Sequence, residues 1–97
     1  METERDLQLY LKNAAKAAGV YQRKMVAVGH VGFPDILLAH RGRVVFVELK
    51  TPKGTGKLSE KQIREIGRLL AAGVQVEVIW QKEEVDELLR EITRVSN

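Results

Sequence analysis

The pattern of hydrophobic and polar positions along the chain predicts three helices. Each helix is marked by apolar residues three or four positions apart, which places them on one helical face. The first stripe is Leu7, Leu11, Ala14 and Ala18, the second is Ile63, Ile66 and Leu70, and the third is Val85, Leu88, Leu89, Ile92 and Val95. Gly19 and Gly73 follow the first two stripes as stop signals, and Ser59 is expected to open the second helix.

Four shorter segments predict strands. They cover residues 23–28, 35–39, 44–49 and 74–80, where β-branched and aliphatic residues are concentrated. Arg41-Gly42 predicts a hairpin between the second and third, whereas a helix separates the third from the fourth and predicts a parallel crossover. The order α-β-β-β-α-β-α therefore predicts an α/β fold with a small mixed β-sheet, an antiparallel meander plus one parallel strand, flanked by helices. At this length, residues 1–97 are expected to form a single domain.

The register of the hairpin predicts a cluster of charged side chains. A loop of even length, either Arg41-Gly42 or residues 40–43, pairs Asp35 directly with Glu48 on one face of the sheet. Because side chains alternate between faces, Lys50 points the same way as Glu48. A loop of odd length would instead put Asp35 and Glu48 on opposite faces. The even loop thus places Asp35, Glu48 and Lys50 together at one end of two strands.

Two opposed carboxylates repel each other, so this cluster needs a cation. Lys50 supplies part of the compensation, and a divalent metal that prefers oxygen ligands, Mg²⁺ or Mn²⁺, would supply more. Such a metal polarises a phosphodiester and lowers the pKa of a bound water. A lysine beside it can position that water or stabilise charge on the phosphate. The residue types therefore match metal-assisted phosphodiester hydrolysis, and the alternative is a structural ion cluster.

The charge distribution points to a polyanionic partner. The net charge is only +3, but residues 23–64 contain nine Lys and Arg against three acids. Nucleic acid is therefore an expected partner. The absence of cysteine excludes disulfides and thiolate metal sites. No apolar run approaches the roughly 20 residues of a membrane span, and the first residues are acidic, so we expect a cytoplasmic protein.

Three ordered motifs resemble a known family. They are Gly32-Phe33-Pro34-Asp35, Val47-Glu48-Leu49-Lys50 and Leu58-Ser59-Glu60-Lys61-Gln62. Together they resemble the VRR-NUC subgroup of the PD-(D/E)XK nuclease superfamily, whose members show a GxPD element, a hairpin ending in VELK and an LSxxQ helix start. The resemblance implies a restriction-endonuclease-like fold and a metal-dependent DNA endonuclease, a hydrolase of intracellular phage or bacterial type. It also implies a homodimer that acts on branched DNA such as four-way (Holliday) junctions.

The resemblance also implies roles for single residues. Asp35 and Glu48 would ligate Mg²⁺ or Mn²⁺, with the backbone carbonyl of Leu49 as a further ligand. Lys50 would be the catalytic lysine. Glu4 matches an acid that the family places near the start of its first helix, with Glu2 as the fallback. Its helical spacing from Leu7 and Leu11 places Glu4 on the inward stripe.

Other assignments keep two interpretations each. Gln62 would help orient the catalytic site, but Ser59 and Gln62 also fit a capping box, and the two roles compete for one side chain. Gly32 is expected to allow close backbone approach, for example by a phosphate. His30 could touch a phosphate, although an exposed loop position is the favoured interpretation.

Basic residues around the motifs are candidates for gripping the DNA backbone: Lys24, Arg41, Arg43, Lys53 and Lys57. Such contacts carry no base sequence information, so we expect the substrate to be selected by shape. Two alternatives remain open. One is a non-catalytic nucleic-acid-binding module, and the other is a flap-processing or end-processing nuclease.

Overall fold

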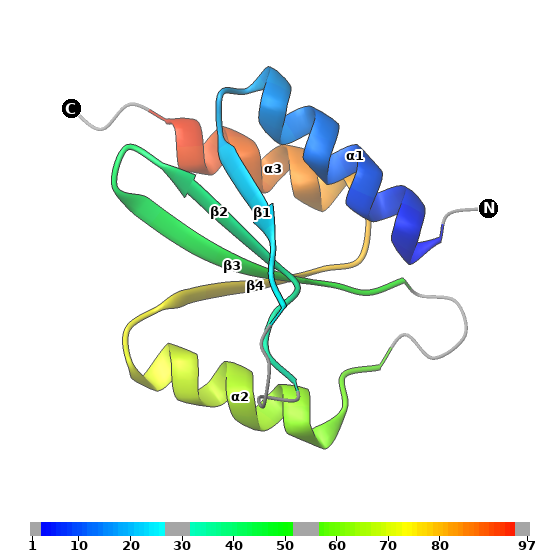
Figure 1. The fold of residues 1–97 in the computed structure, drawn as a ribbon, viewed down its shortest axis with the longest axis vertical. Coiled ribbons are helices and arrows are strands. Elements are labelled where there is room, and N and C mark those ends of the chain that lie inside the picture. Colours follow the sequence, from blue (N-terminus) through cyan, green and yellow to red (C-terminus); the bar gives the residue numbers. More distant parts are fainter. Residues whose placement is uncertain (1–2, 27–31, 52–56, 95–97) are drawn as a thin grey trace.

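The computed structural model of the chain describes residues 3–26, 32–51 and 57–94. Its elements are α1 (Glu4–Ala17), β1 (Tyr21–Lys24), β2 (Ile36–His40), β3 (Arg43–Leu49), α2 (Glu60–Ala71), β4 (Gln75–Ile79) and α3 (Lys82–Thr93). The strands form one sheet in the order β1-β2-β3-β4, antiparallel except for the parallel pair β3–β4. Helices α1 and α3 cover one face and α2 lies on the other (Figure 1). The predicted fold class and element order are confirmed.

The hydrophobic core lies between the sheet and the layer formed by α1 and α3. Its members are Leu7, Leu11 and Ala15 of α1, Val20, Ile36, Leu38, Val45, Val47, Leu49 and Ile79 of the sheet region, and Val85, Leu88, Leu89 and Ile92 of α3. Burying an aliphatic side chain of this size contributes roughly 1.5–3 kcal/mol. The core therefore fixes the ends of β2 and β3, where the predicted charged cluster lies. Among the described helices, none is long and apolar enough to cross a membrane.

The hairpin has the predicted register. Leu37 pairs with Phe46 and the ladder begins at Ile36, opposite Val47. Its turn contains two residues with left-handed backbone angles, Arg41 at φ 49° and Gly42 at φ 83°. A two-residue turn of this kind matches the right-handed twist of the strands. The even loop length that the cluster required is therefore present.

The first helix buries a slightly different stripe from the predicted one. Ala15 is fully buried, whereas Ala18 is exposed because α1 ends at Ala17 and Ala18 serves as its C-cap. The first strand also differs, since β1 begins at Tyr21 and ends at Lys24, two residues earlier at its start than predicted. The predicted positions 27 and 28 lie outside the described residues.

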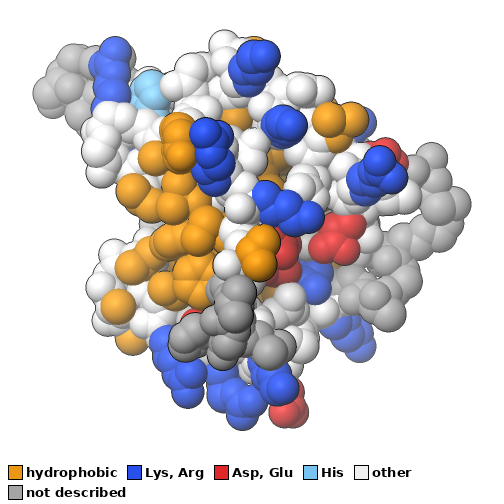
Figure 2. Space-filling view, in the orientation of Figure 1, with side chains coloured by type: hydrophobic (Ala, Val, Ile, Leu, Met, Phe, Trp, Pro, Cys, Tyr) orange, Lys and Arg blue, Asp and Glu red, His pale blue; other side chains and the backbone are white. Residues whose placement is uncertain are grey.

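The second helix is less buried than its apolar stripe predicts. Ile66 is buried, but Ile63 and Leu70 are 56% and 54% exposed. The reason is that α2 packs mainly against β4, at the edge of the sheet. The neighbouring sheet residues of this face, Leu37 and Phe46, are therefore only partly buried. Figure 2 shows hydrophobic side chains gathered between the β2–β3 hairpin and α2.

Candidate active site

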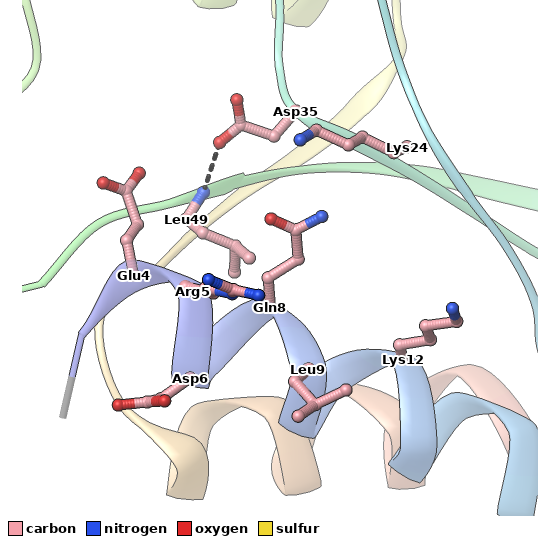
Figure 3. A pocket seen from close by; sticks show the side chains of 9 residues that line it. All are labelled: Glu4, Arg5, Asp6, Gln8, Leu9, Lys12, Lys24, Asp35 and Leu49. Carbon is pink, nitrogen blue, oxygen red and sulfur yellow. Dashed lines mark hydrogen bonds between the residues drawn. The ribbon is translucent and has the colours of Figure 1, made fainter.

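Asp35 lies directly before β2 and is tied to the end of β3. Its Oδ2 accepts a hydrogen bond from the Leu49 N–H at 3.1 Å (Figure 3). Its own backbone carbonyl accepts from the Met25 N–H at 2.6 Å, and Pro34 before it is buried. Its carboxylate is thus fixed by the backbone of β3, and its main chain by the residue that follows β1.

Glu48 is the only charged residue of the described chain that is fully buried, at 1% exposure. One of its oxygens, Oε2, accepts from Gln62 Nε2 at 2.9 Å and lies 3.7 Å from Lys50 Nζ. The other oxygen, Oε1, is buried and has no hydrogen-bond partner among the described residues. A buried carboxylate oxygen without a partner is costly, so this atom fits a ligand for a cation.

A third carboxylate completes the cluster. One oxygen from each of Glu4, Asp35 and Glu48 lies within 4.8 Å of the other two. Glu4 comes from the first turn of α1, which a capping box between Thr3 and Asp6 closes. Glu4 itself is exposed, so the predicted burial on the inward stripe is wrong. Its carboxylate instead points toward Asp35 and Leu49 from the beginning of the helix (Figure 3).

The electrostatics of the cluster oppose a fully ionised state. Burial, and then the neighbouring Asp35 carboxylate, raise the pKa of Glu48 to about 8, and Lys50 offsets this only in part. A divalent cation would reverse the effect, because it favours the charged form of each carboxylate. Three carboxylates, one of which has a buried oxygen without a partner, are a donor set that fits a hard cation such as Mg²⁺ or Mn²⁺.

Gln62 serves the helix and the cluster at once. Its Oε1 accepts from the Ser59 N–H at 2.8 Å, and its backbone N–H donates to Ser59 Oγ at 3.1 Å, which completes the capping box. Its Nε2 remains available and donates to Glu48. The expected competition between the two roles is therefore absent, because each end of the amide has its own partner.

Gly32 explains how α2 comes close enough for this contact. Its φ is +95°, and a Cβ at this position would lie 2.7 Å from the carbonyl carbon and oxygen of Lys61 and 2.9 Å from the Gln62 nitrogen. The close approach expected for a phosphate is thus made by the first turn of α2. The motif that begins at Gly32 therefore packs directly against the backbone that carries Gln62.

The basic candidates are distributed over both ends of the hairpin. Lys24 lines a groove beside Asp35, and Lys57 is exposed shortly before α2. Arg41 lies in the β2–β3 turn, at the opposite end of the strands from Asp35. Arg43 is beside that turn, where its guanidinium donates to Gln75 at 2.9 Å and pairs with Glu91. The candidates Glu2, His30 and Lys53 lie outside the described residues.

A groove adjoins the carboxylates and includes residues that the sequence analysis did not single out. Its volume is about 650 Å³, and its lining includes Arg5, Gln8 and Lys12 of α1, opposite Lys24 of β1 (Figure 3). The sequence contains a signal for two of them. Gln8 and Lys12 follow Glu4 at intervals of four, which places all three on one side of α1.

The comparisons with known proteins agree with this fold. The family model of the VRR-NUC domain matches residues 2–82. A solved structure described as a VRR-NUC domain is 34% identical in sequence, with a TM-score of 0.79. The match covers 90% of this chain and 94% of that one. No curated protein matches the sequence. The chain belongs to the VRR-NUC domain family, a family of nuclease domains, and this membership supports a nuclease role with DNA as the implied substrate.

Proposed function

We propose that this chain is a metal-dependent DNA endonuclease whose cation is held by Asp35 and Glu48, with Glu4 as a further ligand. The observation that carries the proposal is Glu48 Oε1, a buried oxygen without a partner, in a group of three carboxylates within 4.8 Å of one another. A cluster that was only structural would be expected to satisfy that oxygen internally. Mg²⁺ or Mn²⁺ is the proposed cofactor, because both prefer oxygen ligands.

The backbone carbonyl of Leu49 is the proposed fourth ligand. In a strand, the N–H and C=O of one residue point to the same side. The Leu49 N–H points to Asp35, whereas the Lys50 N–H points the other way, to the Ile79 carbonyl of β4 at 2.9 Å. This alternation supports a Leu49 carbonyl directed toward the side on which Asp35 lies.

Lys50 is the proposed catalytic lysine. It lies on the same face as Glu48, its side chain is 15% exposed, and its ammonium is 3.7 Å from Glu48 Oε2. From there it can orient a water for attack and stabilise negative charge on the phosphate. When bound, the divalent cation would polarise the phosphodiester and lower the pKa of the attacking water. Gln62 is a positioning residue, because its hydrogen bond to Glu48 Oε2 fixes the rotamer of Glu48.

We propose branched DNA as the preferred substrate and a homodimer as the active assembly. A two-fold dimer presents two equivalent sites, which suits two cuts across a four-way junction. The exposed apolar side chains Ile63 and Leu70 of α2, and the partly buried Leu37 and Phe46 on the sheet face that α2 covers, support a protein partner on the α2 side. A surface this apolar is a poor contact for phosphates, which leaves the basic side chains to hold the DNA.

The basic candidates remain proposals as DNA contacts. Lys24 and Lys57 are both exposed. Lys24 lines the groove beside Asp35, and Lys57 lies shortly before α2. Arg43 already has protein partners in Gln75 and Glu91, so a DNA contact there would have to replace them. Arg41 would contact DNA only at the turn end of the hairpin, away from Asp35. Lys53 lies outside the described residues and is proposed as a DNA contact from the sequence alone.

The proposal is tested by cleavage of a labelled four-way junction beside a linear duplex of the same sequence, each with Mg²⁺, Mn²⁺ or EDTA. Lys50→Ala is the control. We expect metal-dependent cutting that favours the junction and disappears in the variant. Intact DNA binding without cutting would instead identify a binding module. Preferred cutting of flaps or free ends would assign the enzyme to the end-processing class.

A further inference from the structure

The groove between α1 and β1 extends away from the carboxylates. One end is formed by Glu4, Asp35 and Leu49, which belong to the proposed catalytic site. The remainder is lined by side chains of α1, with Lys24 across from them at the end of β1. Figure 3 shows Gln8 and Lys12 projecting from the same side of α1 as Glu4. The groove therefore continues the site rather than forming a separate pocket.

Three cations line this groove from two different elements. Arg5 and Lys12 come from α1, and Lys24 comes from β1. In the part of the chain that the structure describes, no carboxylate lies within ion-pair distance of any of the three, whereas Arg43, Lys50 and Arg68 each have one. Asp6 also lines the groove, and its carboxylate accepts a hydrogen bond from the Thr3 N–H at 3.0 Å.

Two other lining groups, Gln8 and Leu9, suit a nucleic-acid strand. Gln8 offers an amide that can donate to a phosphate oxygen. Leu9 is 57% exposed and offers an apolar contact for a sugar. Glu4 and Lys12 are eight residues apart on α1, which corresponds to about 12 Å along the helix axis. In duplex DNA, about 12 Å spans roughly three base steps of one strand.

We propose that this groove binds the DNA backbone on one side of the cleaved bond, with Arg5, Lys12 and Lys24 each contacting a phosphate. This inference rests on the proposed function, because it places the cleaved phosphate at the carboxylates. It adds the direction of the strand, which runs from Asp35 along α1 toward Lys12. The contacts position the strand and carry no base sequence information.

The test measures DNA binding by Arg5→Gln/Lys12→Gln with EDTA present, so that cleavage is not involved. The matched control is Arg90→Gln, which removes an exposed cation of α3 that does not line the groove. We expect the double variant to bind about tenfold more weakly at about 0.1 M salt, with a salt slope smaller by about two. The control should keep the original slope. Lys12→Arg should restore the contact that Lys12→Gln removes.

A second measurement locates the strand. A single neutral methylphosphonate placed roughly three nucleotides from the cleaved bond should weaken binding on one side of the cut only, and Lys12→Gln should abolish that sensitivity. An unchanged salt slope in the double variant would overturn the proposal that this groove binds DNA. If the double variant binds DNA more weakly but the original chain cuts DNA with neither Mg²⁺ nor Mn²⁺, the DNA-binding groove is supported and the proposed nuclease function is overturned.

Discussion

Gln62 holds Glu48 with one end of its amide and caps α2 with the other. Nε2 donates to Glu48 Oε2 at 2.9 Å, and Oε1 accepts from the Ser59 N–H at 2.8 Å. The capping bond determines which end of the amide faces the carboxylate. As a result, Glu48 meets a donor, and its second oxygen stays without a protein partner among the described residues, where the proposed cation would bind.

The two roles of Gln62 are separable by mutation. Ser59→Ala removes the cap and should lower the free energy of unfolding by about 1 kcal/mol, with little change in cleavage per folded molecule. Gln62→Glu keeps an oxygen for the cap but turns a further carboxylate toward Glu48. We expect this variant to fold but to lose about 10–100-fold in activity or metal affinity. Denaturant unfolding beside cleavage kinetics measures both effects, and a loss of activity in Ser59→Ala equal to that in Gln62→Glu would contradict the separation.

Asp35→Asn should separate metal binding from folding. The amide oxygen of asparagine can still accept from the Leu49 N–H, which Asp35 Oδ2 accepts at 3.1 Å, so the end of β3 keeps its partner. The negative charge needed for a divalent cation is lost. We expect normal unfolding and DNA binding in EDTA, but no heat of Mg²⁺ or Mn²⁺ binding by calorimetry and no cleavage. Cleavage at the original rate would remove Asp35 from the site.

The metal-free protein should lose stability as the pH rises. The pKa of Glu48 is raised from its ordinary value of 4.5 to about 8 in the folded state, so folding favours the protonated acid. This contribution to stability is complete below about pH 4.5 and disappears as the pH rises through about 8. The slope is at most about 1.4 kcal/mol per pH unit. Denaturant unfolding in EDTA across this range measures it.

Glu48→Gln is the control for that pH dependence, because its amide does not titrate. We expect a flatter profile and greater metal-free stability near pH 8 than in the original chain. Added Mg²⁺ should stabilise the original chain more at about pH 8 than at about pH 5, since only the ionised carboxylate is a ligand. Equal pH profiles for the two proteins would assign the effect to another group.

Gly32→Ala tests the close contact between the motif and α2. The new Cβ would meet the Lys61 backbone at 2.7 Å, on top of the strain of a φ of +95°. Gly73→Ala is the matched control, because its φ is +84° and nothing lies within 4 Å of its Cβ position. The free energy of unfolding should fall by about 1 kcal/mol in the control and by at least about 2 kcal/mol in Gly32→Ala. Gly32→Ala should also displace Gln62. Equal losses would show that α2 shifts without cost.

The exposed positions of α2 test the proposed dimer. Ile63→Glu and Leu70→Glu change side chains that are more than half exposed in the single chain, so the free energy of unfolding of the monomer should change little. We expect both to convert a dimer into a monomer in light scattering, and to reduce paired cutting of a junction more than cutting of a duplex. A monomeric unsubstituted chain at high concentration would reject the dimer.

The sequence predicted the part of the site that local rules determine. Side-chain alternation and an even turn placed Asp35 opposite Glu48, and the ladder from Ile36 to His40 has that register. The apolar stripe of α2 predicted burial that Ile63 and Leu70 do not have, because periodicity alone does not say what an apolar face packs against.

The other features of the site could not be predicted, because they depend on how segments distant in the sequence pack together. The double role of Gln62 depends on Gly32 meeting the first turn of α2, two segments about 30 residues apart in the sequence. Likewise, the exposure of Glu4 depends on where the core ends beneath α1. The groove needed both α1 and β1 in place before Arg5 and Lys24 were seen to share one surface.

The position of Glu4 has a consequence for dynamics. Its carboxylate joins Asp35 and Glu48 from the first turn of a helix, and helix ends open locally at little cost in free energy. A cation shared by all three would tie this turn to the sheet and reduce its conformational entropy. Part of the binding free energy is then spent on ordering the helix end. Occupancy of the site would thus be readable as slower amide hydrogen exchange in the first turns of α1, far along the chain from the hairpin.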